Sequence, residues 1–228
     1  MASLSGIGIC FDVDGTLYPV SKWKIAWKLR KQFGLLRAMH RSRETMRTNN
    51  NVYFTHKEFL EAEAELVGNS LDEPIEKVVE QLADLKPRLA DVMTRNTKPF
   101  PGVLDCLDWA TAQGATMSIL SDYSPDQKLA NLGLQRVNWT ACLGAEECGA
   151  LKPHPVGFNR IREACGEHIR TWIYIGDRED TDILGAQSSD FVPVLFSSEK
   201  SHKAGLRLES WKLVTFQALI GQILGSEA

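Results

Sequence analysis

The sequence predicts an α/β protein in which helices cover both faces of a parallel β-sheet, with a small α-helical cap domain inserted after the first strand. Two observations support this fold class. Beyond residue 102, short apolar runs typical of buried strands alternate with segments of helical periodicity, as in a chain of β-α-β units. Between about residues 19 and 95, the apolar residues recur only at helical spacing. We therefore expect a core formed by residues 1–18 and 97–228, and a cap formed by residues 19–96.

The local patterns place the individual elements of the core. The expected strands cover about residues 7–11, 115–120, 140–143, 171–175 and 191–196. The expected helices cover about residues 103–113, 125–132, 153–165, 182–187 and 215–224. The loop Asn96–Gly102 contains two prolines and a glycine, and it marks the return of the chain from the cap to the core.

Three helices are expected in the cap. The first starts near Trp23, with Ala26, Leu29, Phe33 and Leu36 at helical spacing. The second covers about residues 55–67, with Thr55 as its N-cap. The third starts near residue 72 with a proline in its first turn, and a further proline at position 87 is expected to end or kink it.

The first cap helix is strongly basic. Nine Lys or Arg residues lie between Ser21 and Arg47, against the single acid Glu44. One interpretation is a positive wall that attracts an anionic substrate. The simpler interpretation is a solvated helix face.

Composition narrows the class of protein and its setting. The net charge of −3 gives no general attraction to nucleic acid, so no nucleic-acid partner is expected. The five cysteines are scattered and form no C-x-x-C pair, which suits a reducing cytoplasm. No run of 18 apolar residues is present, so no membrane partner is expected. The oligomeric state remains open.

Two carboxylates follow the first predicted strand, in the order Asp12-Val13-Asp14-Gly15. Because two neighbouring carboxylates repel, a bound cation is expected, and oxygen ligands favour Mg²⁺ or Ca²⁺. An EF-hand calcium loop starting at Asp12 would need glycine at Leu17 and glutamate at Trp23, so that motif is excluded. An acidic turn that only caps the strand is the structural alternative.

Polar residues also follow three later strands or loops. Ser121 ends one predicted strand, Lys152 precedes a proline-started helix, and Asp177 ends another strand. The carboxyl ends of parallel strands meet at one edge of the sheet, where ligands bind in such folds. The sequence therefore predicts that these groups share a crevice with Asp12 and Asp14.

These motifs, in this order, resemble those of the haloacid dehalogenase-like hydrolase superfamily, within its subfamily I, whose members have a helical cap. The motifs are Asp12-Val13-Asp14-Gly15-Thr16-Leu17, then Ser121, then Lys152-Pro153, then Gly176-Asp177 with Asp182. Phosphoglycolate phosphatase-like enzymes are similar at the last motif. Tyr18-Pro19-Val20-Ser21 departs from the acid–serine step that is usual after the first motif. The resemblance implies a Rossmann-like core.

The resemblance also implies roles for these residues. Asp12 would be the nucleophile and Asp14 the general acid and base, with Lys152 as a catalytic cation. Ser121, Asp122 and Lys152 would bind the phosphoryl group. The family's cofactor is Mg²⁺.

In the family, the metal is held by the residues that correspond here to Asp12, Asp14 and Asp177. Asp14 would contribute its backbone carbonyl. Asp182 would orient Lys152 or a metal-bound water.

The function that these residues imply is a Mg²⁺-dependent phosphatase acting on a small phosphorylated metabolite through an aspartyl-phosphate. Asp14 favours phosphate chemistry, because dehalogenation has no leaving oxygen to protonate. A sugar phosphomutase related to β-phosphoglucomutase shares every core residue, so it remains an alternative. A non-catalytic phosphate-binding protein would be expected to have a damaged motif, and the motifs here are intact.

Overall fold

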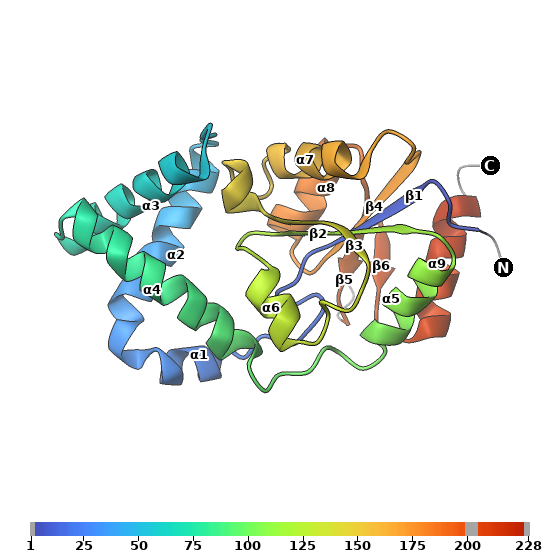
Figure 1. Ribbon diagram of the computed structural model, residues 1–228, viewed down its shortest axis with the longest axis horizontal. Helices are drawn as coiled ribbons and strands as arrows, with labels where there is room; N and C mark the ends of the chain where they lie inside the picture. The colour runs from blue at the N-terminus through green and yellow to red at the C-terminus, as the bar shows by residue number, and fades with distance from the viewer. Residues whose placement is uncertain (1–2, 199–204, 226–228) are drawn as a thin grey trace.

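The structure, a computed structural model, describes residues 3–198 and 205–225. A six-stranded sheet with strand order β3-β2-β1-β4-β5-β6 forms its centre, and every neighbouring pair is parallel (Figure 1). The strands are β1 (Ile7–Phe11), β2 (Thr116–Ser121), β3 (Trp139–Gly144), β4 (Thr171–Gly176), β5 (Val192–Phe196) and β6 (Leu206–Leu208). The predicted α/β fold class is confirmed. The terminal residues 1–2 and 226–228 and residues 199–204 of the predicted core lie outside the described residues.

The sheet is buried on both faces, and its strands alternate between two apolar clusters. In β4, Ile173 and Ile175 belong to one cluster, whereas Trp172 and Tyr174 belong to the other. This alternation follows from the two-residue period of side chains along a strand. It explains why the strands appear in the sequence as continuous apolar runs.

Helices cover the two faces of the sheet. Apolar residues of α5 (Val103–Ala112) and α9 (Leu213–Gly225) join the first cluster, and those of α7 (Val156–Cys165) and α8 (Leu184–Ser188) join the second. Helix α6 (Asp126–Asn131) follows β2. The helix expected over 182–187 starts instead as a π-helical turn at Glu179–Ile183, which runs into α8.

The first four α-helices after β1 lie beside the sheet and form the cap (Figure 1). They are α1 (Lys22–Lys28), α2 (Phe33–Thr48), α3 (His56–Leu71) and α4 (Ile75–Thr94). Thr55 caps α3 as predicted, because its hydroxyl accepts a hydrogen bond from the amide of Glu58 at 3.1 Å. We use "cap" for residues 22–94 from here on.

One sequence expectation about the cap is wrong, and one of the two outcomes expected at Pro87 does not occur. The first basic helix is not continuous, since a 3₁₀ turn at Arg30–Gln32 separates α1 from α2 and leaves Ala26 and Phe33 exposed. Pro87 does not end α4, which runs on to Thr94. Burial of Leu85 and Leu89 on either side of the proline stabilises the helix enough to offset the lost hydrogen bond.

No helix among the described residues combines the length and apolar character needed to cross a lipid bilayer.

Candidate active site

A cavity of about 910 Å³ lies between the cap and the carboxyl edge of the sheet. Strands β1, β2 and β4 end at this edge, next to the point where the strand order reverses between β1 and β4. The core side of the cavity is lined by the predicted residues, namely Asp12, Asp14, Ser121, Asp122, Lys152, Asp177 and Asp182. The structure therefore brings all seven together, although the first and the last, Asp12 and Asp182, are 170 positions apart in the sequence.

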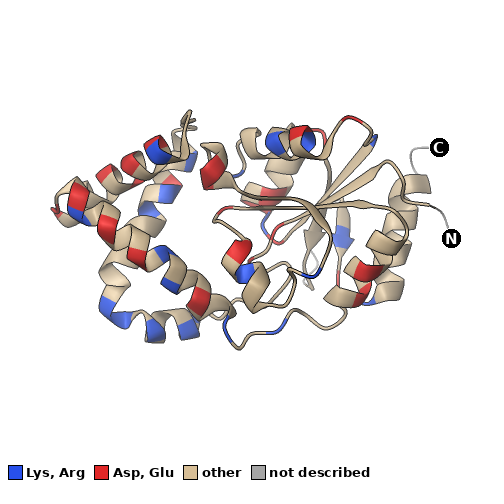
Figure 2. Ribbon diagram, in the orientation of Figure 1, with Lys and Arg blue, Asp and Glu red and all other residues tan. Residues whose placement is uncertain are grey.

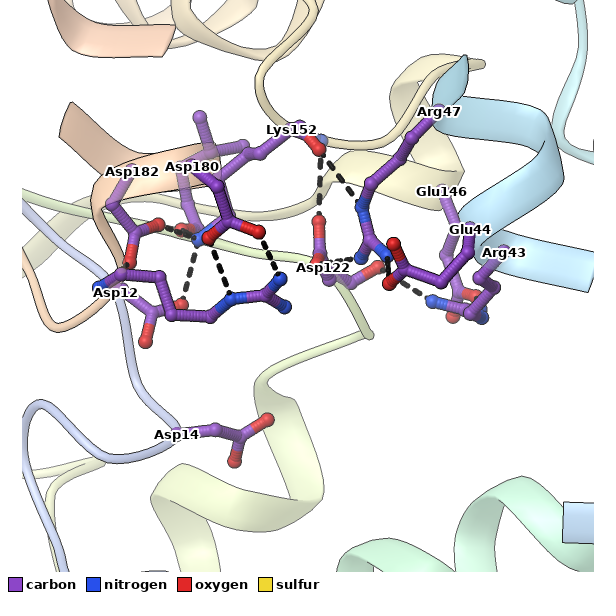
Figure 3. A network of polar contacts seen from close by, with 12 residues as sticks. Asp12, Asp14, Arg43, Glu44, Arg47, Asp122, Glu146, Lys152, Asp180 and Asp182 are labelled. Carbon is purple, nitrogen blue, oxygen red and sulfur yellow. Dashed lines mark hydrogen bonds and ion pairs between the residues drawn. The ribbon is translucent and has the colours of Figure 1, made fainter. Parts of the chain in front are cut away.

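Lys152 is the centre of the buried charges (Figure 3). Its ammonium lies 2.8 Å from Oδ1 of Asp12, 2.6 Å from Oδ1 of Asp182 and 2.9 Å from the hydroxyl of Tyr174. Burial alone would lower the pKa of Lys152, but the carboxylates of Asp12 and Asp182 raise it well above its usual value. Lys152 therefore carries a fixed positive charge beside Asp12.

Three carboxylates meet beside that charge. Oxygens of Asp12, Asp177 and Asp182 all lie within 4.8 Å of one another. Both oxygens of Asp182 have protein partners, because Oδ1 accepts from Lys152 and Oδ2 accepts from the amide of Arg178. Oδ1 of Asp177 is buried and accepts no hydrogen bond from any residue that the structure describes. Among the described residues, Asp177 therefore has the oxygen that is open to a cation, and Asp12 lies beside it with its oxygens accepting from Lys152 and Thr16. The oxygen donor set fits Mg²⁺.

The pKa values of these carboxyls show the same excess of negative charge. Burial raises the pKa of Asp177 to about 6, and the neighbouring Asp182 adds to the effect. Burial also raises the pKa of Asp12 above its usual value, against the opposing effect of Lys152. A divalent cation between Asp12 and Asp177 would offset this repulsion.

Ser121 ends β2, Asp122 follows it, and both residues line the cavity. The Ser121 hydroxyl is buried and has no hydrogen-bond partner among the described residues, so it has capacity for a ligand oxygen. The Asp122 carboxylate accepts from the amide of Lys152 at 3.2 Å and pairs with Arg47 of the cap. Burial acts to raise the pKa of Asp122, but Lys152 and Arg47 lower it below its usual value.

Asp14 lies in the segment that follows β1, apart from the cluster of carboxylates (Figure 3). Its carboxylate pairs with the ammonium of Lys128 on α6 and accepts a hydrogen bond from the hydroxyl of Tyr18. Lys128 and Tyr18 are both buried. These two contacts position the Asp14 side chain at the cavity wall, apart from the three clustered carboxylates.

Sequence reasoning missed several groups that surround the site. Tyr174, Lys128 and Arg47 were not among the predicted site residues, yet each contacts one that was. Tyr174 lies inside an apolar strand and Lys128 inside an ordinary helical pattern, so neither carries a local signal. Arg47 was counted only as one of the basic residues of the cap.

The cap is held to the core by buried ion pairs (Figure 3). Arg43 pairs with Glu63 of the cap at 2.6 Å and with Glu146 of the core. Arg47 pairs with Asp122 and also donates from Nε to the Lys152 carbonyl at 3.0 Å. The contacts of Arg47 connect α2 directly to the loop after Ser121 and to the loop that carries Lys152.

The match to a family model settles the class of protein. The model of the haloacid dehalogenase-like hydrolases matches residues 8–190. The chain belongs to this family. The match covers every predicted site residue, and the predicted resemblance is confirmed.

A curated relative agrees with the predicted class of enzyme. Glyceraldehyde 3-phosphate phosphatase of Methanopyrus kandleri is 29% identical over 199 residues, which is 82% of each chain. The family match and this relative together support a hydrolase of the phosphatase type, as predicted.

Solved structures share the fold across the whole chain. The HAD-hydrolase YfnB from Bacillus subtilis, bound to magnesium, aligns with a TM-score of 0.62 at 16% identity, covering 99% of this chain and 100% of its own. A HAD phosphatase from Thermococcus onnurineus aligns with a TM-score of 0.57 at 17% identity, covering 96% and 97%. At these identities the alignments establish the fold, including the inserted cap helices.

Proposed function

We propose that this chain is a Mg²⁺-dependent phosphatase that hydrolyses a small phosphomonoester through an aspartyl-phosphate on Asp12. One observation carries the proposal. The Asp12 carboxylate lies 2.8 Å from the buried Lys152 ammonium, in a cavity that also contains the unpartnered Ser121 hydroxyl and the unpartnered Asp177 oxygen. A nucleophile, a positive charge, a phosphoryl-oxygen donor and a cation ligand are the groups that this reaction needs.

In the first step, a carboxylate oxygen of Asp12 attacks phosphorus, and the bond from phosphorus to the leaving oxygen breaks. Thr16 donates to Oδ2 of Asp12 at 3.2 Å and Lys152 donates to Oδ1, so the carboxylate is held in one orientation. Lys152 and Ser121 bind the phosphoryl oxygens as negative charge develops on them.

Asp14 moves the protons. It gives a proton to the leaving oxygen, then takes one from the water that attacks the aspartyl-phosphate and regenerates Asp12. Lys128 and Tyr18 orient its carboxylate. Because Lys128 and Tyr18 each donate to one oxygen of the Asp14 carboxylate, Asp14 must exchange one of these contacts for the substrate oxygen during the cycle.

Asp12, Asp177 and the Asp14 carbonyl would hold Mg²⁺, and Asp182 would orient Lys152. The bound cation would neutralise charge between the anionic nucleophile and the anionic phosphoryl group. Gly15 supports this assignment, since a side chain there would occupy the space beside Asp177.

The first substrate to assay is glyceraldehyde 3-phosphate, because the curated relative is named for it.

We infer a cytoplasmic setting from the five cysteines, all of which are free thiols.

The test is phosphate release by the Asp12→Asn variant in the presence of Mg²⁺. Because an amide is not a nucleophile, turnover of every phosphomonoester should fall by at least about four orders of magnitude. Asp108→Asn, an exposed change on α5, is the matched control and should retain activity. Thermal unfolding should show that both variants are folded.

Turnover by Asp12→Asn at the wild-type rate would refute the mechanism. Formation of an isomeric sugar phosphate without release of phosphate would instead identify a phosphomutase.

A further inference from the structure

One face of the cap is both aromatic and basic. It consists of α1, the 3₁₀ turn after it and the start of α2, and we call it the aromatic–basic face. Its aromatic members are Trp23, Trp27 and Phe33, and its exposed basic members are Lys28, Arg30, Lys31 and Arg37. The segment from Ser21 to Arg37 contains no Asp or Glu. In Figure 2, α1 accordingly carries blue and no red.

The aromatic side chains of this face are not part of the apolar core. Trp23 is 77% exposed, and Trp27 and Phe33 are each 51% exposed. The rings of Trp23 and Trp27 stack on each other, with centroids 6.4 Å apart and planes 5° apart. Large rings gathered on a surface without a partner mark an interaction site rather than a packing requirement.

The positive charges of the face are not neutralised by the neighbouring helix. Asp84 and Asp91 of α4 pair with Arg88 and with the C-cap residue Arg95, and Asp84 also accepts from the neutral side chain of Gln32 at 3.4 Å. Lys28 and Arg30 instead lie beside the Trp27 ring, 5.0 and 5.6 Å from its centroid. The partner of this face should therefore be anionic and should also accept aromatic side chains.

We propose that the aromatic–basic face binds the surface of an anionic lipid bilayer. Trp rings and Lys or Arg side chains on one exposed helix match the interfacial layer, where rings rest at the headgroups and cations bind lipid phosphates. A nucleic acid is less suited to this geometry. A stacked base needs a free ring face, and the Trp27 ring already contacts Trp23, Lys28 and Arg30.

This proposal revises the expectation of no membrane partner. That expectation depended on the absence of a long apolar run, which excludes spanning the bilayer but not lying on its surface. The same helix also lines the candidate active site with Lys22 and Ile25. Binding through α1 would therefore hold the cap wall of the active-site cavity close to the lipid.

The experiment is co-sedimentation of the full chain with vesicles of phosphatidylcholine, alone or mixed with phosphatidylglycerol. Binding should occur only with the anionic vesicles and should weaken as salt is raised above about 0.1 M, where the screening length is about 10 Å. Tryptophan emission should shift to shorter wavelength on binding, since two of the six tryptophans enter a less polar layer.

Two double variants separate the contribution of the aromatic rings to vesicle binding from that of the positive charges. Trp23→Ala with Trp27→Ala should reduce partitioning at least about tenfold, because burial of two rings is lost, and should abolish the emission shift. Lys28→Gln with Lys31→Gln should reduce it by roughly fivefold per charge. Phe54→Ala, which removes a 97% exposed ring elsewhere on the cap, is the matched control and should bind as the wild type does. All the changed side chains are exposed, and thermal unfolding should confirm that each variant is folded.

Equal binding to neutral and anionic vesicles, or unchanged binding by the double Trp variant, would overturn the proposal. So would binding to single-stranded RNA without binding to vesicles. A dimer in solution that the double Trp variant converts to a monomer would identify the face as a contact between copies of the chain, again against the proposal. None of these outcomes depends on phosphatase activity.

Discussion

Buried charge at the site is tolerated because nearly every charged atom has a partner. Lys152 donates to Asp12, Asp182 and Tyr174, and its side chain is only 3% exposed. A buried ammonium without such partners would cost several kcal/mol. Two buried polar atoms of the cavity, on Ser121 and Asp177, have no hydrogen-bond partner within the described part of the chain, and a ligand can supply that partner.

Ser121→Ala tests whether the Ser121 hydroxyl binds an oxygen of the ligand. The change should lower kcat/KM for phosphate release by about 10²- to 10³-fold, as expected for loss of one donor to a developing charge. The free energy of unfolding should not fall, because the hydroxyl makes no hydrogen bond with residues 3–198 or 205–225.

Ser118→Ala is the matched control, since Ser118 is also buried in β2 but does not line the cavity. It should leave kcat/KM unchanged. A loss of stability in Ser121→Ala with no loss of activity would assign Ser121 a structural role.

At the scale of elements, the turn after β1 brings the first motif against the end of β4. Gly15 has a φ of +86°, and a Cβ atom at this position would lie 2.2 Å from Oδ2 of Asp177. Glycine is therefore required at position 15 for two reasons, the backbone conformation and the limited space beside a candidate cation ligand.

Gly15→Ala should consequently lose both stability and Mg²⁺ binding. The backbone alone should cost about 1 kcal/mol, and the clash should displace Asp177 and weaken Mg²⁺ binding measured by calorimetry at least about tenfold. Gly133→Ala isolates the backbone effect, because Gly133 has a φ of +71° and nothing lies within 4 Å of its added Cβ. Equal Mg²⁺ affinity in the two variants would contradict the assignment of Asp177.

The contact between the cap helices and the 3₁₀ turn at Ala145–Cys148 depends on buried charges. Glu146 pairs with Arg43 and with Lys86, which lies 3.0 Å away. Burial acts to raise the pKa of Glu146, but Arg43 and Lys86 lower it below the ordinary value of 4.5. Glu146 therefore contributes stability above pH 4.5, and this contribution is lost as the pH falls through the lowered pKa.

Glu146→Gln should reduce the free energy of unfolding by about 3 kcal/mol at neutral pH, since it leaves buried cations incompletely paired. The difference from the wild type should narrow in urea titrations carried out below pH 4.5, because the unfolded carboxyl then binds a proton while the folded one titrates only at its lowered pKa. Glu163→Gln, at an exposed ion pair with Arg160, should show little effect at either pH. A difference that is independent of pH would exclude Glu146 as the titrating group.

At the scale of the whole molecule, the cap and the core share the cavity and are joined by α2. Arg47 connects the two most directly, because it contacts both Asp122 and the Lys152 carbonyl. The amide of Tyr53 adds a second connection by donating to the Gly149 carbonyl at 2.9 Å. Both connections fix the distance between the cap wall and the phosphoryl-binding residues.

Arg47→Ala should therefore loosen the cap. We expect kcat/KM to fall by about tenfold to a hundredfold, and the radius of gyration measured by small-angle X-ray scattering to increase. Arg95→Ala removes an exposed ion pair within α4 and should change neither quantity. Unchanged kinetics in Arg47→Ala would show that the cap is held in place without this contact.

The sequence alone was enough to predict the fold class, the order of the core elements and the family. Burial on both faces makes strands apolar throughout, and chemistry at the strand ends requires particular residues, so both features leave local patterns. The seven predicted site residues line one cavity because the carboxyl ends of parallel strands meet at one edge of the sheet. Their catalytic and metal-binding roles stay predictions.

Only the tertiary structure decided how charges pair across the molecule. Nothing local to Tyr174, Lys128 or Arg47 indicates that they contact Lys152, Asp14 and Asp122, because each pair is separated by 22 to 114 positions. Likewise, helical periodicity could not reveal that α1 turns Trp23 and Trp27 outward, or that α4 continues through Pro87. The physical reason is common to all of these. Periodicity records which residues prefer burial, whereas the packing of elements distant in the sequence determines which of them obtain a partner.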